Sequence, residues 1–385
     1  MSLRHDILAD LAGIAPSSAL AAARQTREAA TRHAQGSYDA LFTTHDETFS
    51  AEARFSVAAK VAKWHNADDL AAHYAGLGLT DPTSAQLAPA IEFARLLTFS
   101  PVKATPEALN SLQAAGWSAE NIVTLAQLIA FVSFQSRLLA GLRLLNGKPV
   151  LHNDAPVVAG SWHTTAQTRS GKAAPVRFTQ QELGWEPWIA AKQLEEFSVD
   201  EQAVLARFGH SNSDYFRLLG RNLPVLEQRT LTDKGIFYTP GGLPRAEREL
   251  AATVASKVNG CIYCASVHAR KTSQLSKADN AVETLLAVAP GGALHEGQSA
   301  RWQAEIDAAA ALSVTPPALT RDHISRLESE GLDTLEQLDL IQSAAFFCLG
   351  QSVDVNPGRT VPAVASCRMA LRLSDLQNPA TFYLS

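Results

Sequence analysis

Positive charge is scarce in this sequence of 385 residues, in which 38 acidic residues outnumber 33 basic ones. The formal net charge of -5 provides no basic surplus for nucleic-acid phosphates, so we expect no nucleic-acid partner. Cysteine is also rare, and four cysteines in so long a chain do not form the disulfide framework of a small secreted protein. No uninterrupted apolar run approaches the roughly 18 to 20 residues that cross a bilayer, so we expect no membrane span.

The amino-terminal segment is rich in alanine but lacks the continuous apolar stretch of an export signal. Asp6 and Asp10 interrupt it, and the surrounding residues are of mixed polarity. We therefore expect a cytoplasmic protein. The composition, 46% hydrophobic and 18% charged, is that of an ordinary soluble globular protein. The length allows two or three domain-sized units.

Alternating strand patterns are rare, whereas apolar residues recur three and four positions apart in segment after segment. The sequence therefore predicts an all-α protein. Within residues 106–142, Gly116 separates two helices and Ser118 is placed to cap the second. Proline, glycine and polar residues gather between the two halves of the chain. We place a linker at residues 159–182, between an amino-terminal domain (1–158) and a carboxyl-terminal domain (183–385).

The two halves contain an internal repeat. Residues 96–134 align without a gap with residues 311–349, pairing Gly116 with Gly331 and Phe131 with Phe346. Upstream, residues 53–77 align with residues 248–272. This alignment places Arg54, Asn66, Asp69 and His73 opposite Glu249, Cys261, Cys264 and His268 respectively. We infer one working copy and one scaffold copy without thiols.

The working copy contains the pattern Cys-x-x-Cys-x-x-x-His at Cys261, Cys264 and His268. Asn259 and Gly260 form a helix-ending pair, so the cysteines are expected to open a new helix, whose positive end favours thiolates. His268 lies one turn beyond Cys264, where an imidazole can exchange the thiol proton.

Glu249 lies on the preceding helix, and a turn at Gly260 brings its carboxylate back toward His268. A zinc site and an inert pair of core cysteines remain open alternatives, but thiol redox chemistry explains the spacing best. The two other cysteines, Cys348 and Cys367, have mostly apolar neighbours and are expected to be buried structural thiols.

The spacing of Glu249, Cys261, Cys264 and His268, with its Asn-Gly lead-in, resembles the signature of the alkylhydroperoxidase D family. The wider superfamily of that family includes the carboxymuconolactone decarboxylases. The segment after the motif, "SVTPPALTRDHISRLESEGLDTLEQLDLIQSAAFF", is similar to the peroxidase-related branch. The resemblance implies two tandem helical domains of this family, the first lacking the cysteines, and association into a homo-oligomer.

The resemblance also implies a role for each residue. Cys264 would be the peroxidatic cysteine, Cys261 the resolving one, and His268 with Glu249 the relay that activates Cys264. Tyr263 stands where the best-known pattern has a histidine, and its hydroxyl can still form hydrogen bonds.

These roles describe a thiol-dependent peroxidase whose substrate is a peroxide. No nicotinamide or flavin motif is present, so we expect no cofactor, and electrons would come from an external dithiol, dihydrolipoyl or a small thiol. A decarboxylase-like or lactone-processing enzyme and a non-enzymatic redox sensor or scaffold are the alternatives. The cysteine pair favours the peroxidase, because decarboxylases of this superfamily need no such pair.

Overall fold

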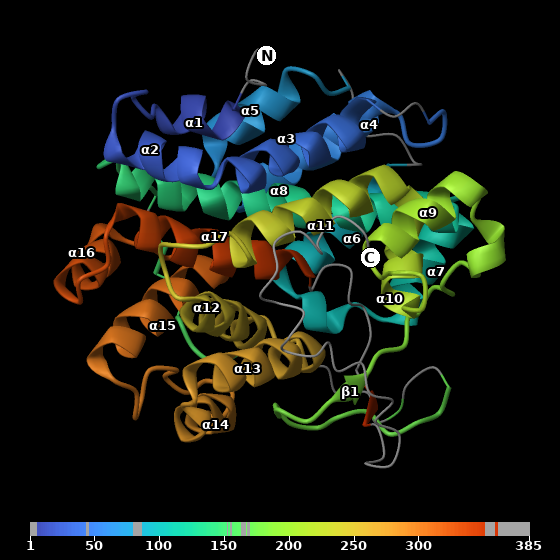
Figure 1. The fold of residues 1–385 in the computed structure, drawn as a ribbon. Helices are drawn as coiled ribbons and strands as arrows, with labels where there is room; N and C mark the ends of the chain where they lie inside the picture. The colour runs from blue at the N-terminus through green and yellow to red at the C-terminus, as the bar shows by residue number, and fades with distance from the viewer. Residues whose placement is uncertain are drawn as a thin grey trace.

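The chain is almost entirely helical (Figure 1), which confirms the expected all-α class. The computed structural model describes residues 6–43, 46–79, 87–151, 153–154, 156–162, 167, 170–350 and 359–360. Two short strands, β1 (Leu183–Gly184) and β2 (Arg359–Thr360), pair antiparallel. The helices therefore determine where the site lies.

The helices of the amino-terminal half are α1 Ile7–Ala12, α2 Ala19–Thr26, α3 Glu28–Thr43, α4 Ala51–Trp64, α5 Asp68–Ala75, α6 Ala88–Phe99, the 3-10 turn η1 Pro101–Lys103, α7 Pro106–Ala114 and α8 Ala119–Leu145. Those of the carboxyl-terminal half are η2 Leu194–Glu196, α9 Val199–Arg207, α10 Asp214–Leu219, η3 Gly220–Asn222, α11 Leu223–Phe237, α12 Arg245–Val258, α13 Ile262–Ser276, α14 Asp279–Ala287, α15 Ala300–Ser313, α16 Arg321–Ser329 and α17 Thr334–Gly350.

The helix boundaries recur between the aligned segments. The helices α7 and α16 each contain 9 residues. Each is followed by a left-handed glycine, Gly116 with φ of 86° and Gly331 with φ of 85°. Ser118 caps α8 as expected, because its hydroxyl accepts a hydrogen bond from the Asn121 N–H at 3.1 Å. The same local signals therefore divide both halves into helices at the same places.

The helix ends correct the alignment of the α4 and α12 regions by one residue. Both helices contain 14 residues, and each is followed by a left-handed residue, Asn66 or Gly260. The next residue forms the same backbone hydrogen bond in both copies, from Ala67 to the Ala62 carbonyl at 3.0 Å and from Cys261 to the Ser256 carbonyl at 2.9 Å. Ala67, and not Asn66, therefore occupies the position of Cys261.

In the corrected register, Phe55, Leu70 and Tyr74 occupy the positions of Glu249, Cys264 and His268, and Arg54 occupies that of Arg248. The prediction that placed Arg54, Asn66, Asp69 and His73 there was wrong, because it was anchored on the identity of two histidines and not on the helix ends. The conclusion that the first copy lacks thiols is unaffected.

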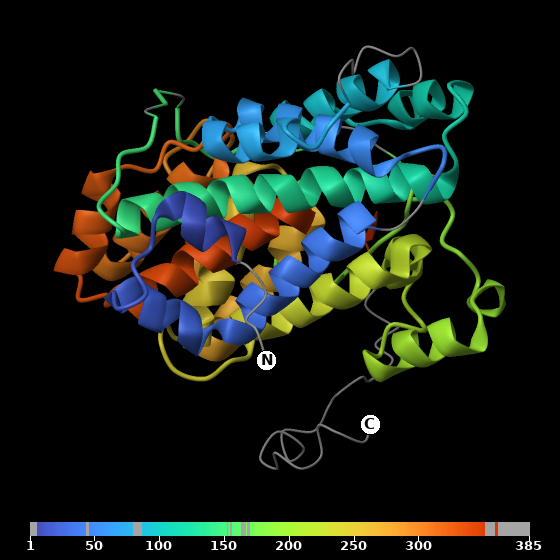
Figure 2. The same cartoon turned by 90° about the horizontal axis from the view of Figure 1, so that it is seen from above.

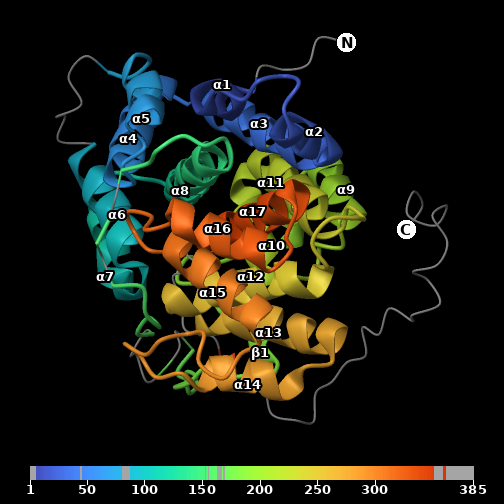
Figure 3. The same cartoon turned by 90° about the vertical axis from the view of Figure 1, so that its left-hand side faces the viewer.

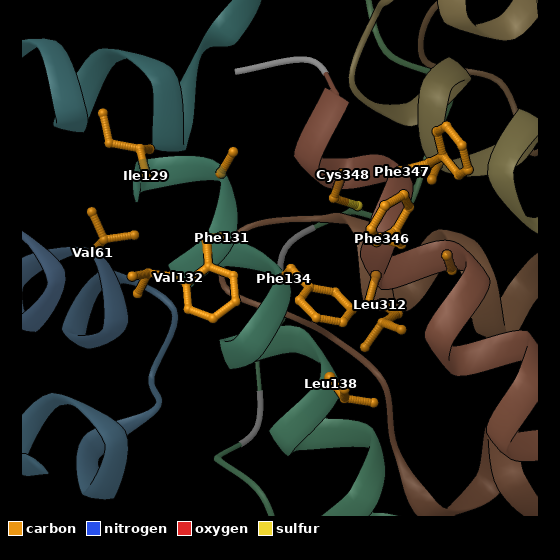
Figure 4. Close-up of a cluster of buried hydrophobic side chains, with 14 of the residues drawn as sticks. Val61, Ile129, Phe131, Val132, Phe134, Leu138, Leu312, Phe346, Phe347 and Cys348 are labelled. Atoms are coloured by element: carbon orange, nitrogen blue, oxygen red, sulfur yellow. The ribbon is translucent and has the colours of Figure 1, made fainter. Parts of the chain in front are cut away.

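The two halves share one hydrophobic core. The helix α3 packs along α11, and α8 packs along α17, so α8 and α17 lie side by side in the middle of the molecule (Figures 2 and 3). Phe134 of α8 and Phe346 of α17 meet edge to face, with 5.8 Å between ring centroids (Figure 4). The domain bounds 1–158 and 183–385 stay a prediction, since this core is continuous across them.

A buried ionic cluster also joins the halves. Arg27, at the end of α2, donates two hydrogen bonds to Asp339 of α17, at 2.6 and 2.8 Å. Arg248 of α12 approaches the same carboxylate to 3.1 Å. Arg27 is fully buried and Asp339 is 1% exposed. The cluster fixes the segment before α12, because Arg27 and Arg248 both donate to the Gly241 carbonyl.

The linker is packed against the second half. The backbone of Ala159 forms hydrogen bonds in both directions with residues 291–292, and Gly160 N–H donates to the Lys257 carbonyl at 3.1 Å. Phe178 belongs to a small apolar cluster that also contains Ile262 of α13. The predicted linker therefore covers the region around the cysteine turn.

By length and composition alone, α8 qualifies as a candidate membrane span. The expectation of no span considered only uninterrupted apolar runs, whereas α8 contains scattered polar residues within a hydrophobic helix. Its most apolar stretch is wholly buried inside the described structure, which is typical of the core helix of a soluble protein.

Candidate dithiol site

The two cysteines lie at a tight turn between α12 and α13. Asn259 ends α12, and Gly260 has a φ of 81°, a backbone conformation that favours glycine. Cys261 is the N-cap of α13, and its Sγ accepts a hydrogen bond from the Cys264 N–H at 3.2 Å. The predicted helix start at the cysteines is therefore confirmed.

Cys261 and Cys264 form a disulfide, with their Cα atoms 5.4 Å apart. The helical turn alone brings the two sulfurs together. Cys264 is buried, with 6% of its surface exposed, whereas Cys261 is more accessible. The two sulfurs therefore differ in their access to solvent, although they belong to the same turn.

His268 and Glu249 form the predicted pair across the two helices. The distance between His268 Nδ1 and Glu249 Oε2 is 2.8 Å, and both side chains are buried. A neutral imidazole that donates from Nδ1 to a carboxylate leaves Nε2 as its acceptor. Because His268 follows Cys264 by one helical turn, this arrangement suits proton exchange with the buried thiol.

Arg245 is a further member of the site that the sequence analysis missed. It precedes Glu249 by one turn of α12, and its Nε and Nη2 atoms donate to Glu249 Oε1 at 3.3 and 3.2 Å. The guanidinium also lies over the Tyr238 ring, 4.0 Å from its centroid. Glu249 therefore uses one carboxylate oxygen for Arg245 and the other for His268. The spacing of four residues between Arg245 and Glu249 was the available signal.

The electrostatics keep Glu249 ionised. Burial raises the pKa of Glu249, but hydrogen bonds and positive charge from His268 and Arg245 outweigh it, so the pKa lies below its ordinary value. Asp233 of α11 behaves differently. Burial raises its pKa, with Glu249 adding to the effect and Arg229, His268 and Arg245 opposing it. Burial thus dominates at Asp233, whereas the partners His268 and Arg245 dominate at Glu249.

Two aromatic residues pack next to His268. The ring of Phe347, from α17, lies 3.8 Å from the imidazole, centroid to centroid. Phe237, from α11, packs on Phe347 with centroids 5.2 Å apart. Figure 4 shows Phe347 at the end of α17, on the side away from α8. No sequence signal connects Phe347 to His268, because the two residues meet only through the tertiary fold.

The Tyr263 side chain packs against apolar residues. Its ring packs against the apolar cluster of Phe178, Ile262 and Leu286, and its backbone carbonyl accepts a hydrogen bond from Ser266. Tyr263 therefore lies between the dithiol and Phe178 of the linker. Its proposed catalytic contribution stays a prediction.

In the first half, the positions equivalent to Glu249 and His268 hold aromatic side chains. Phe55, at the position of Glu249, stacks on Phe42 with ring centroids 4.2 Å apart. Tyr74, at the position of His268, is fully buried and donates a hydrogen bond to Gln135. Aromatic packing thus takes the place of the Glu249 and His268 pair in the first half.

The remaining cysteines differ in what the structure describes. Cys348 is a buried free thiol, and the Asn259 side-chain amide donates to its Sγ at 3.7 Å, whereas Cys367 lies outside the described residues. Within the described ranges, no group of three or more His, Cys, Asp and Glu side chains is arranged to hold a metal ion.

A protein-family model matches part of the chain. The model of the carboxymuconolactone decarboxylase family matches residues 224–313, a segment that contains α12, the cysteine turn and α13. Among curated proteins, none matches the chain. That family belongs to the AhpD-like superfamily, and the matched segment holds the dithiol, His268 and Glu249.

Proposed function

We propose that the protein is a thiol-dependent peroxidase that reduces peroxides through Cys261 and Cys264. The observation that carries this proposal is the disulfide at the start of α13, with a buried histidine and carboxylate pair one turn away. A dithiol stores two electrons, and the neighbouring imidazole can accept the proton that thiolate formation releases.

The reaction begins with the reduced dithiol. His268 Nε2 accepts the proton of Cys264, and the thiolate attacks the distal oxygen of the peroxide, breaking the O–O bond. Cys264 becomes a sulfenic acid, and the alkoxide takes the proton and leaves as an alcohol, or as water when the substrate is hydrogen peroxide. Cys261 then attacks the Cys264 sulfur, which forms the disulfide and releases the sulfenic oxygen as water.

An external dithiol of the dihydrolipoyl type, or a small thiol, closes the cycle by exchange. Its thiolate attacks the more accessible Cys261 sulfur, so that Cys264 leaves as the thiolate beside His268. A second thiol, from the same dithiol or from a second molecule of the small thiol, then releases Cys261 and leaves the reductant as a disulfide. The unequal exposure of the two sulfurs supports this division of roles.

We further propose that residues 1–158 are a degenerate copy of the same domain, kept as a scaffold. The recurring helix ends support this reading. A homo-oligomer and a cytoplasmic location remain parts of the proposal. The cytoplasm suits a dithiol that must be reduced again after each cycle.

A decarboxylase-like enzyme is the second candidate, favoured by the family match itself. That activity would depend on Glu249 and His268 and persist without the cysteines. A redox sensor is the third candidate, and it would form the disulfide once without turnover. Thiol dependence and multiple turnovers therefore distinguish the three.

Single-turnover experiments on the reduced protein test the proposal. Cys264→Ser should consume no peroxide, because a serine hydroxyl does not ionise near neutral pH. Cys261→Ser should consume about one equivalent and hold a sulfenic acid on Cys264, which a dimedone-type probe labels. Cys348→Ser is the matched control, and it should behave like the unmodified protein.

The opposite labelling would reverse the cysteine roles. A sulfenic acid on Cys261 in the Cys264→Ser protein would make Cys261 the attacking residue. Unchanged peroxide consumption in the Cys261→Ser, Cys264→Ser double variant would remove the peroxidase proposal altogether.

A further inference from the structure

A cavity of about 160 Å³ lies in the first half, at the turn that corresponds to the dithiol turn. It is bounded by this turn between α4 and α5, by the carboxyl-terminal half of α8, and by residues 150–151, 317 and 319. In the corrected register, Asn66 and Ala67 of the lining correspond to Gly260 and Cys261. The cavity therefore lies where the first copy would carry its cysteines.

Each of the two turns is covered by a segment from the other half of the chain. Val102, of η1, lies against the dithiol turn, because a Cβ added to Gly260 would be 2.5 Å from the Val102 Cγ1. In the alignment of residues 96–134 with 311–349, Val102 pairs with Pro317, which lines the cavity in the first half. Equivalent segments therefore cover both turns, and the first copy keeps a space beneath its cover.

The cavity has room for a small organic molecule. An apolar protein cavity of about 150 Å³ holds a benzene ring, and this one measures about 160 Å³. Its apolar lining includes Leu139, Ala140 and Val150. Leu151, also in the lining, is 57% exposed, so the cavity reaches the surface. A compact hydrocarbon ring can therefore enter from solvent and fit inside.

The charged side chains of the lining are already paired. Asp68 accepts a hydrogen bond from Lys63 Nζ at 2.9 Å. Arg143 uses its Nη2 to pair with Asp69, and the same atom donates to the Leu11 carbonyl at 3.4 Å. Each charge at the cavity thus has an opposite charge beside it, so neither a cation nor an anion has a free partner there. This arrangement favours a neutral ligand.

Arg143 still has one hydrogen-bond donor to offer. Its Nε is buried and has no acceptor among the described residues. The other basic side chain of the lining, His65, has both ring nitrogens in use, because Nδ1 donates to the Val61 carbonyl at 2.9 Å and Nε2 accepts from Arg137 at 2.8 Å. A buried N–H without an acceptor is unfavourable, so a ligand oxygen that accepts from Arg143 Nε would be favoured.

We propose that this cavity binds a small neutral cyclic ketone. The carbonyl oxygen of the ligand would accept a hydrogen bond from Arg143 Nε, and its ring would lie against Leu139, Ala140 and Val150. Small-molecule sites commonly combine an apolar lining with a few polar groups that fix the orientation of the ligand. The site is separate from the dithiol, so its test does not depend on peroxide reduction.

Ligand-observed NMR titration of the full chain with cyclohexanone tests the proposal. Cyclohexanone should bind in the millimolar range or tighter, as expected for so small a molecule. Cyclohexanecarboxylate should bind at least about tenfold more weakly, because its charge would leave water without a free partner in the cavity. Cyclohexene has a similar ring without the oxygen, and it measures binding to the apolar lining alone.

One variant tests the hydrogen bond to the ketone. Arg143→Lys keeps a positive charge beside Asp69 but removes the Nε donor, so it should weaken cyclohexanone binding about tenfold or more and leave cyclohexene binding unchanged. Arg221→Lys is the matched control. Arg221 also pairs with a carboxylate, that of Glu120, and its Nε also lacks an acceptor among the described residues, but it does not line the cavity. This control should bind both compounds like the unmodified protein.

Two other variants assign the binding to this space. Ala140→Leu should fill the cavity and weaken binding of both compounds at least about tenfold. Leu151→Trp should do the same from the exposed side, where a larger side chain does not disturb the core. Ala72→Leu, at an exposed alanine of α5 outside the lining, is the control and should change neither affinity.

Three results would overturn the proposal. The first is the absence of saturable cyclohexanone binding at concentrations well above the millimolar range, in a protein with the expected helical circular dichroism. The second is binding to Ala140→Leu and Leu151→Trp that is as strong as binding to Ala72→Leu. The third is an Arg143→Lys protein that binds cyclohexanone as tightly as Arg221→Lys does, or that loses cyclohexanone and cyclohexene to the same extent.

Discussion

Replacing Glu249 by glutamine removes one hydrogen-bond acceptor from a residue that uses two. The carboxylate accepts from His268 with one oxygen and from Arg245 with the other. A glutamine has a single oxygen, and its amide group is a donor that cannot satisfy either partner. If the oxygen turns to Arg245, the amide faces His268 Nδ1 and favours the tautomer with its proton on Nε2, which cannot accept the thiol proton.

The structure sets the size of the effect. A hydrogen bond to a charged group contributes about 1.5–3 kcal/mol, and each 1.36 kcal/mol corresponds to a factor of ten in rate. Glu249→Gln should therefore slow disulfide formation with peroxide by roughly 10- to 150-fold. Raising the pH should restore part of the rate, because the thiol then ionises without the relay.

Arg245 provides the matched test. In the double variant Glu249→Gln, Arg245→Met, the glutamine oxygen has no competing donor and can accept from His268. The double variant should therefore react faster than Glu249→Gln alone. The assay is stopped-flow fluorescence of the reduced protein after mixing with cumene hydroperoxide, with free thiols counted at the end.

The reasoning fails if Glu249→Gln reacts as fast as the unmodified protein. It also fails if Arg245→Met slows the Glu249→Gln protein by the same factor by which it slows the unmodified protein. The two effects would then be additive, and Arg245 would not compete with His268 for the glutamine oxygen.

Two further predictions concern stability. Arg27→Met should lower the free energy of unfolding by about 3 kcal/mol. This is near the lower end for a broken buried ion pair, because Arg248 still faces Asp339. The control Arg32→Met, at an exposed ion pair, should lower it by less than about 1 kcal/mol, and equal losses in urea melts would contradict the prediction. Burial, with Glu247 adding to it, raises the pKa of Glu305 to about 9. Its protonated form therefore stabilises the fold fully below the ordinary pKa and less as the pH rises toward 9. In Glu305→Gln, the free energy of unfolding should depend less on pH between about pH 5 and 9 than in the unmodified protein. The same pH dependence in both proteins would refute the prediction.

The sequence predicts the dithiol turn well because its signals are local. Gly260 must adopt a left-handed conformation, the cysteines open the next helix, and His268 follows Cys264 by one turn. The return of Glu249 toward His268 also follows from this turn. These relations depend on residues less than 20 positions apart, and periodicity and turn chemistry determine them.

Contacts between distant segments escaped prediction. Phe347 reaches His268 from α17, and Arg27 reaches Asp339 across nearly the whole chain. Neither pair has a sequence signature, because the packing of helices brings the residues together. The one-residue error at Asn66 has a different cause, since the histidine identity used for alignment conflicts with the helix ends.

The shared core has a consequence for behaviour on dilution. In a dimer of separate chains, the support that one copy gives the other is lost when the concentration falls below the dissociation constant. Here Arg27 and α8 belong to the same chain as the dithiol. The covalent connection keeps them next to the second copy at any protein concentration. The geometry around the dithiol should therefore be the same in a nanomolar solution as in a concentrated one.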